Sequence, residues 1–89
     1  MFSLAQLSLI ASEVIGTPVH IEGPMTAIDI DGWDSLNNTL IALEISAKYN
    51  IDFNGEMAGQ CRTFAEYVDF VRGMIEARDA AWNSVDKPT

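Results

Sequence analysis

The chain has 89 residues, 48% of them hydrophobic, which suits one small domain with a single core and is too apolar for a disordered segment. Thirteen acidic residues against five basic ones give a formal net charge of −8. This charge repels the phosphates of nucleic acids and of anionic membranes, so we expect neither as a partner.

The first helix is predicted to run from about Leu4 to Val14 or Ile15. Ser3 and Gln6 have the spacing of a capping box, and Gly16 followed by Pro18 ends the helix. No basic residue precedes the apolar positions and polar residues interrupt them, which is untypical of a signal peptide or a membrane span. One face of the helix carries the apolar side chains Leu4, Leu7, Ile10, Ala11 and Val14.

A long connection, residues 17–33, follows. Loops of this length are uncommon in compact domains and are often functional. His20, the only histidine, lies here without an obvious partner, so we expect a surface residue and not a ligand or a catalytic base. The apolar residues of the loop are expected to hold it against the helices: Val19, Ile21, Met25, Ile28 and Ile30.

Three further helices are predicted after this loop. The second begins at Asp34 or Ser35 and ends near Tyr49, and residues 55–62 contain a short third helix. The last helix begins at Phe64 and runs to Trp82, after a capping box that Thr63 forms with Glu66. Its buried stripe consists of Phe64, Tyr67, Val68, Val71 and Ile75.

The predicted fold class is all-α: a small four-helix bundle of three main helices and a short third helix, with a long loop between the first two. Residues 1–82 form the single domain, and residues 83–89 form a disordered tail. The only cysteine, Cys61, cannot form an internal disulfide and is expected to be a buried or half-buried side chain. A reducing compartment, the cytoplasm, is therefore expected.

The segment "IDIDGWDSLNN", residues 28–38, contains the candidate site. Asp29 and Asp31 begin like a calcium loop, but that loop needs glycine at its sixth position and glutamate at its twelfth, which are Asp34 and Leu40 here. These acids therefore fail as a calcium site. No metal site is expected.

Ser35 has three further interpretations. "DSL" occurs in the GDSL esterases, but Trp33 replaces their glycine, and serine chemistry needs a base that this chain does not offer nearby. Asp34 is also a good N-cap residue, which contributes about 1 kcal/mol and needs no function for Ser35. The third interpretation, a covalent attachment point, comes from a resemblance.

"GWDSL" opens the most apolar helix of an acidic, helical chain, after a long loop that follows a first helix. In this respect residues 3–75 resemble the acyl carrier protein family, whose D-S-L motif carries 4′-phosphopantetheine on its serine. Core positions of the family match Ile41, Ile45, Tyr49 and Phe53, and "CRTFAEYVDFV" stands where its final helix lies.

The resemblance implies an acyl-carrier-like protein that is not itself an enzyme. Ser35 would carry 4′-phosphopantetheine derived from coenzyme A, attached by a phosphopantetheinyl transferase that uses Mg²⁺. Asp34 would cap the helix and assist the transferase, and Leu36 would contribute to docking. Further partners would be an acyl-loading ligase or acyltransferase and downstream biosynthetic enzymes, which a monomeric carrier would visit in turn.

The second predicted helix has two apolar stripes. One consists of Leu36, Leu40, Leu43 and Ala47, and the other of Ile41, Ile45 and Tyr49. Either the loop covers the first stripe and the helix is buried all round, or this stripe faces outward. The resemblance favours an outward docking surface of Leu36, Leu40 and Leu43, and it leaves Asp29 and Asp31 available to a basic partner.

The helix also departs from carriers of general fatty acid synthesis, which have more acidic residues there. Leu40 and Ser46 occupy positions that are often acidic, and Lys48 partly offsets Glu44. The favoured function is a carrier for a specialised fatty-acid or polyketide-type pathway. The alternatives are a peptidyl or aminoacyl carrier, and a helical adaptor that does not use the serine.

Overall fold

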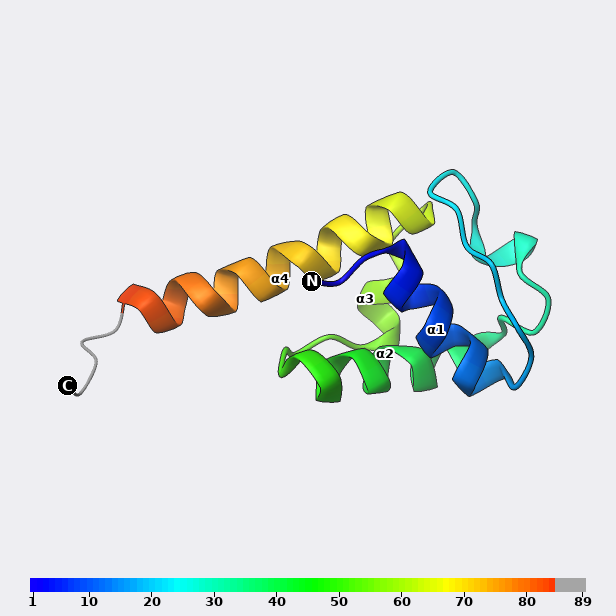
Figure 1. Ribbon diagram of the computed structural model, residues 1–89, viewed down its shortest axis with the longest axis horizontal. Helices are drawn as coiled ribbons and strands as arrows, with labels where there is room; N and C mark the ends of the chain where they lie inside the picture. The colour runs from blue at the N-terminus through cyan, green and yellow to red at the C-terminus, as the bar shows by residue number, and fades with distance from the viewer. Residues whose placement is uncertain (85–89) are drawn as a thin grey trace.

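The computed structural model describes residues 1–84 of the chain as four α-helices and one short 3₁₀ helix, with no strand in that range. In chain order the elements are α1 (Leu4–Ile15), η1 (Ala27–Asp29), α2 (Ser35–Tyr49), α3 (Gly55–Gly59) and α4 (Phe64–Ser84). In Figure 1, α1 lies between α2 and the first half of α4, and the second half of α4 extends beyond the bundle. The predicted small helical bundle is confirmed.

The end of α4 lies two residues beyond the predicted Trp82. The predicted disordered tail, residues 83–89, is wrong at residues 83 and 84, which belong to α4, and its remainder, residues 85–89, lies outside the described part of the chain. Among residues 1–84, no helix combines the length and the apolar character that crossing a membrane requires.

Local signals in the sequence set the ends of α1. The Ser3 hydroxyl accepts a hydrogen bond from the backbone N–H of Gln6 at 3.3 Å. At the other end, Gly16 adopts a left-handed conformation (φ +92°) and donates its N–H to the Ser12 carbonyl at 2.9 Å. These contacts satisfy backbone groups that a helix leaves unpaired at its ends, which is why the predicted bounds hold.

The core lies where α1, α2 and α4 meet. The predicted apolar faces supply most of it, but Phe2 was not predicted to be buried. The backbone carbonyl of Phe2 accepts a hydrogen bond from Arg72 Nε of α4 at 2.7 Å, which holds the residue before α1 against the last helix. The largest fully buried side chains are Phe2, Leu7, Ile10, Ile41, Ile45, Phe53 and Val71.

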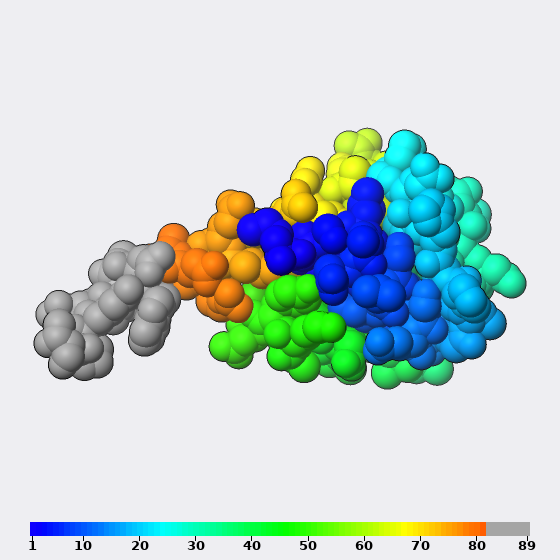
Figure 2. Space-filling model, in the orientation of Figure 1, coloured from blue at the N-terminus to red at the C-terminus, as the bar shows by residue number. Residues whose placement is uncertain are grey.

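The loop after α1 packs against the bundle through polar as well as apolar residues. Ser12 Oγ accepts a hydrogen bond from Val19 N at 2.8 Å, and Ser8 Oγ accepts one from Ile21 N at 3.2 Å. The serines that interrupt the apolar face of α1 therefore bind the loop. Figure 2 shows the result, a continuous surface formed by α1 and the loop that follows it.

One prediction for this loop is wrong. Ile21 and Ile30 are buried as expected, but Ile28 is 95% exposed. The reason is the 3₁₀ turn η1, which has three residues per turn, so that Ile28 and Ile30 cannot face the same side.

The second half of the loop contacts the beginning of α4. The backbone N–H of Phe64 donates to the Met25 carbonyl at 2.9 Å, and that of Ala65 donates to the Gly23 carbonyl at 3.0 Å. These bonds satisfy donors in the first turn of α4. The loop, the start of α4 and the start of α2 are thereby brought together around one cavity.

Candidate functional site

Ser35 is the first residue of α2 and its side chain is exposed. Asp34 caps the helix as predicted, with Oδ1 accepting a hydrogen bond from Asn37 N at 2.8 Å. Ser35 Oγ makes no hydrogen bond with any residue that the structure describes, whereas its carbonyl accepts one from Thr39 Oγ1 at 3.1 Å. The hydroxyl is therefore accessible and uncommitted, at a helix end that favours negative charge.

The turn before the serine is held by Gly32. This residue has φ +89°, a left-handed conformation that glycine adopts without strain, and an added Cβ would lie 2.7 Å from Ile15 Cγ2. Its carbonyl accepts hydrogen bonds from Asn37 Nδ2 at 2.8 Å and from Asp34 N at 3.1 Å. The turn thus lies close against Ile15 of α1 and is hydrogen-bonded to the first turn of α2.

Trp33 and Asn38 connect the same turn to α3. Trp33 Nε1 donates to Asn38 Oδ1 at 3.1 Å, and Asn38 Nδ2 donates to the Gly55 carbonyl at 3.0 Å. The amide of Asn38 uses both of its polar atoms, which fixes the orientation of the indole. The tryptophan is therefore a rigid wall two residues from the serine.

A cavity of about 430 Å³ opens beside Ser35. Its walls come from the loop before α2, from the starts of α2 and α4, and from α3 with the segment that follows it, and they include Trp33, Ser35, Asn38, Cys61, Phe64 and Tyr67. This volume lies within the range of small-molecule sites in proteins. The Trp33 ring lies 4.8 Å from the Phe64 ring and 6.1 Å from the Tyr67 ring, so much of the wall is aromatic.

Tyr67 contributes a buried polar group that no residue of the described range 1–84 satisfies. The residue is 3% exposed, and its hydroxyl oxygen is buried without a hydrogen-bond partner in the described structure. Burial raises the pKa of Tyr67 above its ordinary value, with a smaller contribution from the nearby Cys61 sulfur. The phenol therefore stays protonated near neutral pH, and its hydroxyl is enclosed by the surrounding side chains, out of reach of a group in the cavity.

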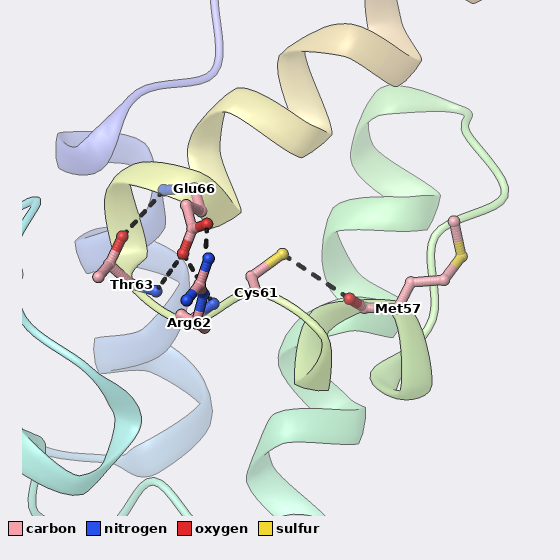
Figure 3. Close-up of polar contacts among 5 residues, drawn as sticks. All are labelled: Met57, Cys61, Arg62, Thr63 and Glu66. Carbon is pink, nitrogen blue, oxygen red and sulfur yellow. Dashed lines mark hydrogen bonds and ion pairs between the residues drawn. The ribbon is translucent and has the colours of Figure 1, made fainter.

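The other polar side chains at this end of the cavity have structural roles (Figure 3). Glu66 Oε2 accepts hydrogen bonds from the backbone N–H groups of Arg62 and Thr63, at 3.0 and 3.1 Å, and so completes the predicted capping box of α4. Cys61 is half-buried as predicted, with Sγ 3.7 Å from the Met57 carbonyl oxygen. Burial, and then the Glu66 carboxylate, raises the pKa of Cys61, which disfavours a nucleophilic thiolate.

The acidic residues of the loop do not gather into a metal site. Asp29 Oδ2 accepts a hydrogen bond from Thr26 N at 2.9 Å, so this carboxylate stabilises the turn at η1, a role that the sequence did not reveal. Asp31 is exposed, and His20 is exposed with Nε2 3.6 Å from Glu22 Oε2. Within residues 1–84, no three His, Cys, Asp or Glu side chains are grouped as metal ligands.

The two stripes of α2 separate clearly. Ile41 and Ile45 are fully buried, whereas Leu36, Leu40 and Leu43 are 67%, 42% and 56% exposed. The loop therefore does not cover the leucines. They form an exposed apolar surface on the helix that Ser35 begins, which we call the leucine face.

Tyr67, Trp33 and Phe64 were not predicted to be parts of a site. Tyr67 and Phe64 were predicted as core residues because their helical spacing suits a buried stripe, and both are indeed buried. The signal that was present is chemical: a buried tyrosine usually finds a partner for its hydroxyl, and no partner for Tyr67 is evident in the sequence.

No protein-family model, no curated protein and no solved structure matches this chain. An interpretation of the site therefore depends on its own geometry and on the sequence motif. The geometry combines an accessible serine at a helix N-terminus, an adjacent cavity with aromatic walls, and a buried donor without a partner.

Proposed function

We propose that this protein is an acyl carrier: it tethers acyl groups as thioesters on a 4′-phosphopantetheine arm at Ser35 and presents them to partner enzymes. The observation that carries the proposal is the exposed Ser35 hydroxyl at the first position of α2, beside a cavity of about 430 Å³. A specialised fatty-acid or polyketide-type pathway fits best, because Leu40 and Ser46 occupy positions of α2 that are often acidic in general fatty-acid carriers.

The residues around Ser35 fit such a group. A phosphodiester on Ser35 Oγ would carry its negative charge beside the free N–H groups of the first turn of α2, where the helix dipole stabilises anions. Asp34 keeps its side chain on the Asn37 N–H and so defines where the helix begins. The aromatic walls suit the methyl groups of the arm.

Within this proposal, the chain supplies attachment and recognition, and the partner enzymes supply the chemistry. A phosphopantetheinyl transferase would form the bond between Ser35 Oγ and the phosphorus of the arm while the pyrophosphate bond of coenzyme A breaks, so that the serine proton is lost and adenosine 3′,5′-bisphosphate leaves. The thiol at the end of the arm supplies the thioester. What this chain does is to expose the hydroxyl, orient it on a rigid turn and offer a surface for docking.

The leucine face is the proposed docking surface. Exposed apolar patches commonly mark binding sites, and a helix that presents side chains three and four positions apart fits a groove on a partner. Asp31 is exposed in the loop before α2, and Asp29 keeps an exposed side chain despite its bond to Thr26. Both acids would attract a basic rim around such a groove.

Intact-mass measurement after incubation with coenzyme A, Mg²⁺ and a broad-specificity transferase tests the proposal. We expect a gain of one phosphopantetheine, which is lost in Ser35→Ala. Thr39→Ala is the matched control, because it removes an exposed hydroxyl one turn further along α2 and should keep the gain. If several transferases add no phosphopantetheine, the helical adaptor is favoured instead, because an adaptor needs only the exposed leucine face to bind a partner.

A further inference from the structure

A groove runs along the outer face of α1, between this helix and the loop that follows it. One part of it is a hollow of about 510 Å³, whose apolar walls are Leu4, Ala5, Leu9, Val19 and Ile21. An adjoining hollow of about 490 Å³ shares Leu9 and Ser12 with the first and continues to Pro18. Figure 2 shows α1 and the loop side by side, in blue and cyan. We call the two hollows together the α1 groove.

Hydrogen bonds hold the two walls of the α1 groove together. Ser12 Oγ accepts one from Val19 N at 2.8 Å and Ser8 Oγ accepts one from Ile21 N at 3.2 Å, so the loop cannot leave α1 without losing both. A preformed site costs less free energy to occupy than one whose walls must first become ordered. The same bonds use backbone N–H groups that an added β-strand would need, so the groove suits an inserted helix.

Leu9 lies at the junction of the two hollows and is 58% exposed. It is the only large hydrophobic residue of α1 that is exposed. Single exposed leucines are common on protein surfaces, but Leu9 lines the same hollow as Leu4, Val19 and Ile21. The α1 groove therefore offers a connected apolar surface to a partner.

The charged residues beside the α1 groove are acidic. Glu13 lines one end and is exposed, and the exposed Glu22 has Oε2 3.6 Å from Nε2 of His20, which lines the groove. Among residues 1–84, no lysine or arginine lines either hollow. Charge complementarity therefore favours a partner with basic residues beside its apolar ones. A second copy of this chain is disfavoured, because each copy has a net charge of −8.

We propose that the α1 groove is a docking site for an amphipathic helix of another protein, whose apolar side chains cover Leu9 and whose lysines or arginines pair with Glu13 and Glu22. Because α1 has 12 residues and is about 18 Å long, about three turns of the partner helix match it. The groove shares no residue with the cavity beside Ser35 or with the leucine face. A protein bound here would therefore leave both of them free for other partners.

Stapled helical peptides of about three turns test the docking site, because a staple keeps so short a helix folded in water. All peptides carry the same stripe of leucines, flanked in one peptide by lysines and in another by glutamines. With isotope-labelled protein, we expect the lysine peptide to shift the NMR signals of Leu9, Val19 and Ile21. At low salt it should bind about three- to tenfold more tightly than the glutamine peptide, the equivalent of two exposed ion pairs.

Matched variants assign the binding to the groove. Leu9→Ser should weaken the binding of both peptides about five- to tenfold, whereas Leu43→Ser, at a leucine that is 56% exposed on the leucine face, should leave it unchanged. Joint replacement of Glu13 and Glu22 by glutamine should abolish the preference for the lysine peptide, whereas Glu44→Gln on α2 should keep it. All five residues are exposed, so we expect every variant to fold, which circular dichroism checks.

The outcomes that would overturn the inference are distinct. Equal binding of the two peptides, or no binding of the lysine peptide at millimolar concentration, would exclude a basic partner. Shifts confined to Leu36, Leu40 and Leu43 would place the peptide on the leucine face instead. A dimer of the free protein that Leu9→Ser dissociates would make a second copy the occupant. Because Ser35 lies outside the groove, failure of its modification would overturn the carrier function alone and leave this inference standing.

Discussion

Replacing Leu40 and Ile41 in turn by alanine separates the two faces of α2. The residues are neighbours on one helix, but Leu40 is 42% exposed and Ile41 is fully buried. Truncating a buried leucine or isoleucine costs 2–5 kcal/mol, because both apolar burial and packing are lost, so we expect about 3 kcal/mol for Ile41→Ala. Leu40→Ala loses only partly buried surface and should cost about 1 kcal/mol or less.

Urea unfolding followed by far-UV circular dichroism measures both values, with equal m-values as the check that the unfolding transition is unchanged. In thermal melts, each 1 kcal/mol corresponds to about 4–8 °C in a domain of this size. Leu40→Ala should also raise the KM of partner enzymes while leaving the helix content unchanged. An equal or larger loss of stability for Leu40→Ala than for Ile41→Ala would refute the assigned orientation of α2, and with it the leucine face.

Four further substitutions test the turn and the burial of Tyr67. Gly32→Ala should lower the free energy of unfolding by about 3 kcal/mol, because φ is positive and the added Cβ would lie only 2.7 Å from Ile15 Cγ2. Gly16→Ala should lower it by about 1 kcal/mol, because its φ is also positive but its Cβ meets nothing within 4 Å. Equal losses of stability in urea unfolding would contradict the close approach of Gly32 to Ile15. Asp34→Ala should cost about 1 kcal/mol through loss of the cap, and an unchanged midpoint would argue against it.

The last substitution, Tyr67→Phe, tests stability at alkaline pH. Folded Tyr67 keeps its proton above pH 10, where the unfolded chain loses it, so stability falls as the pH rises. Between pH 10 and pH 11, the free energy of unfolding of the wild type should fall by about 1 kcal/mol more than that of Tyr67→Phe. Parallel pH profiles of the two proteins in urea unfolding would contradict the burial of the phenol.

The parts of the fold that could be predicted are those that local chemistry determines. The caps at Ser3, Asp34 and Thr63 each act on a backbone N–H three residues away, so the sequence reveals where α1, α2 and α4 begin. Helical periodicity likewise separates the buried Ile41 and Ile45 of α2 from the leucine face.

The parts that could not be predicted depend on contacts between distant segments. The Met25 carbonyl accepts a hydrogen bond from the backbone N–H of Phe64, thirty-nine positions later in the sequence. No local sequence pattern predicts such a pair. The cavity arises in the same way, because Trp33 and Tyr67, whose rings lie 6.1 Å apart, are thirty-four positions apart in the sequence. Helical spacing correctly predicts Tyr67 as buried, but it does not reveal that the hydroxyl lacks a partner.

The central claim is that Ser35 carries a phosphopantetheine arm in the cell. Peptide mass mapping of the protein purified from its native host tests it most directly, because the host supplies its own transferase and coenzyme A. We predict that the peptide containing Ser35 carries one phosphopantetheine, free or as a thioester. An unmodified Ser35 peptide, in a lysate where other carriers bear the arm, would contradict the account.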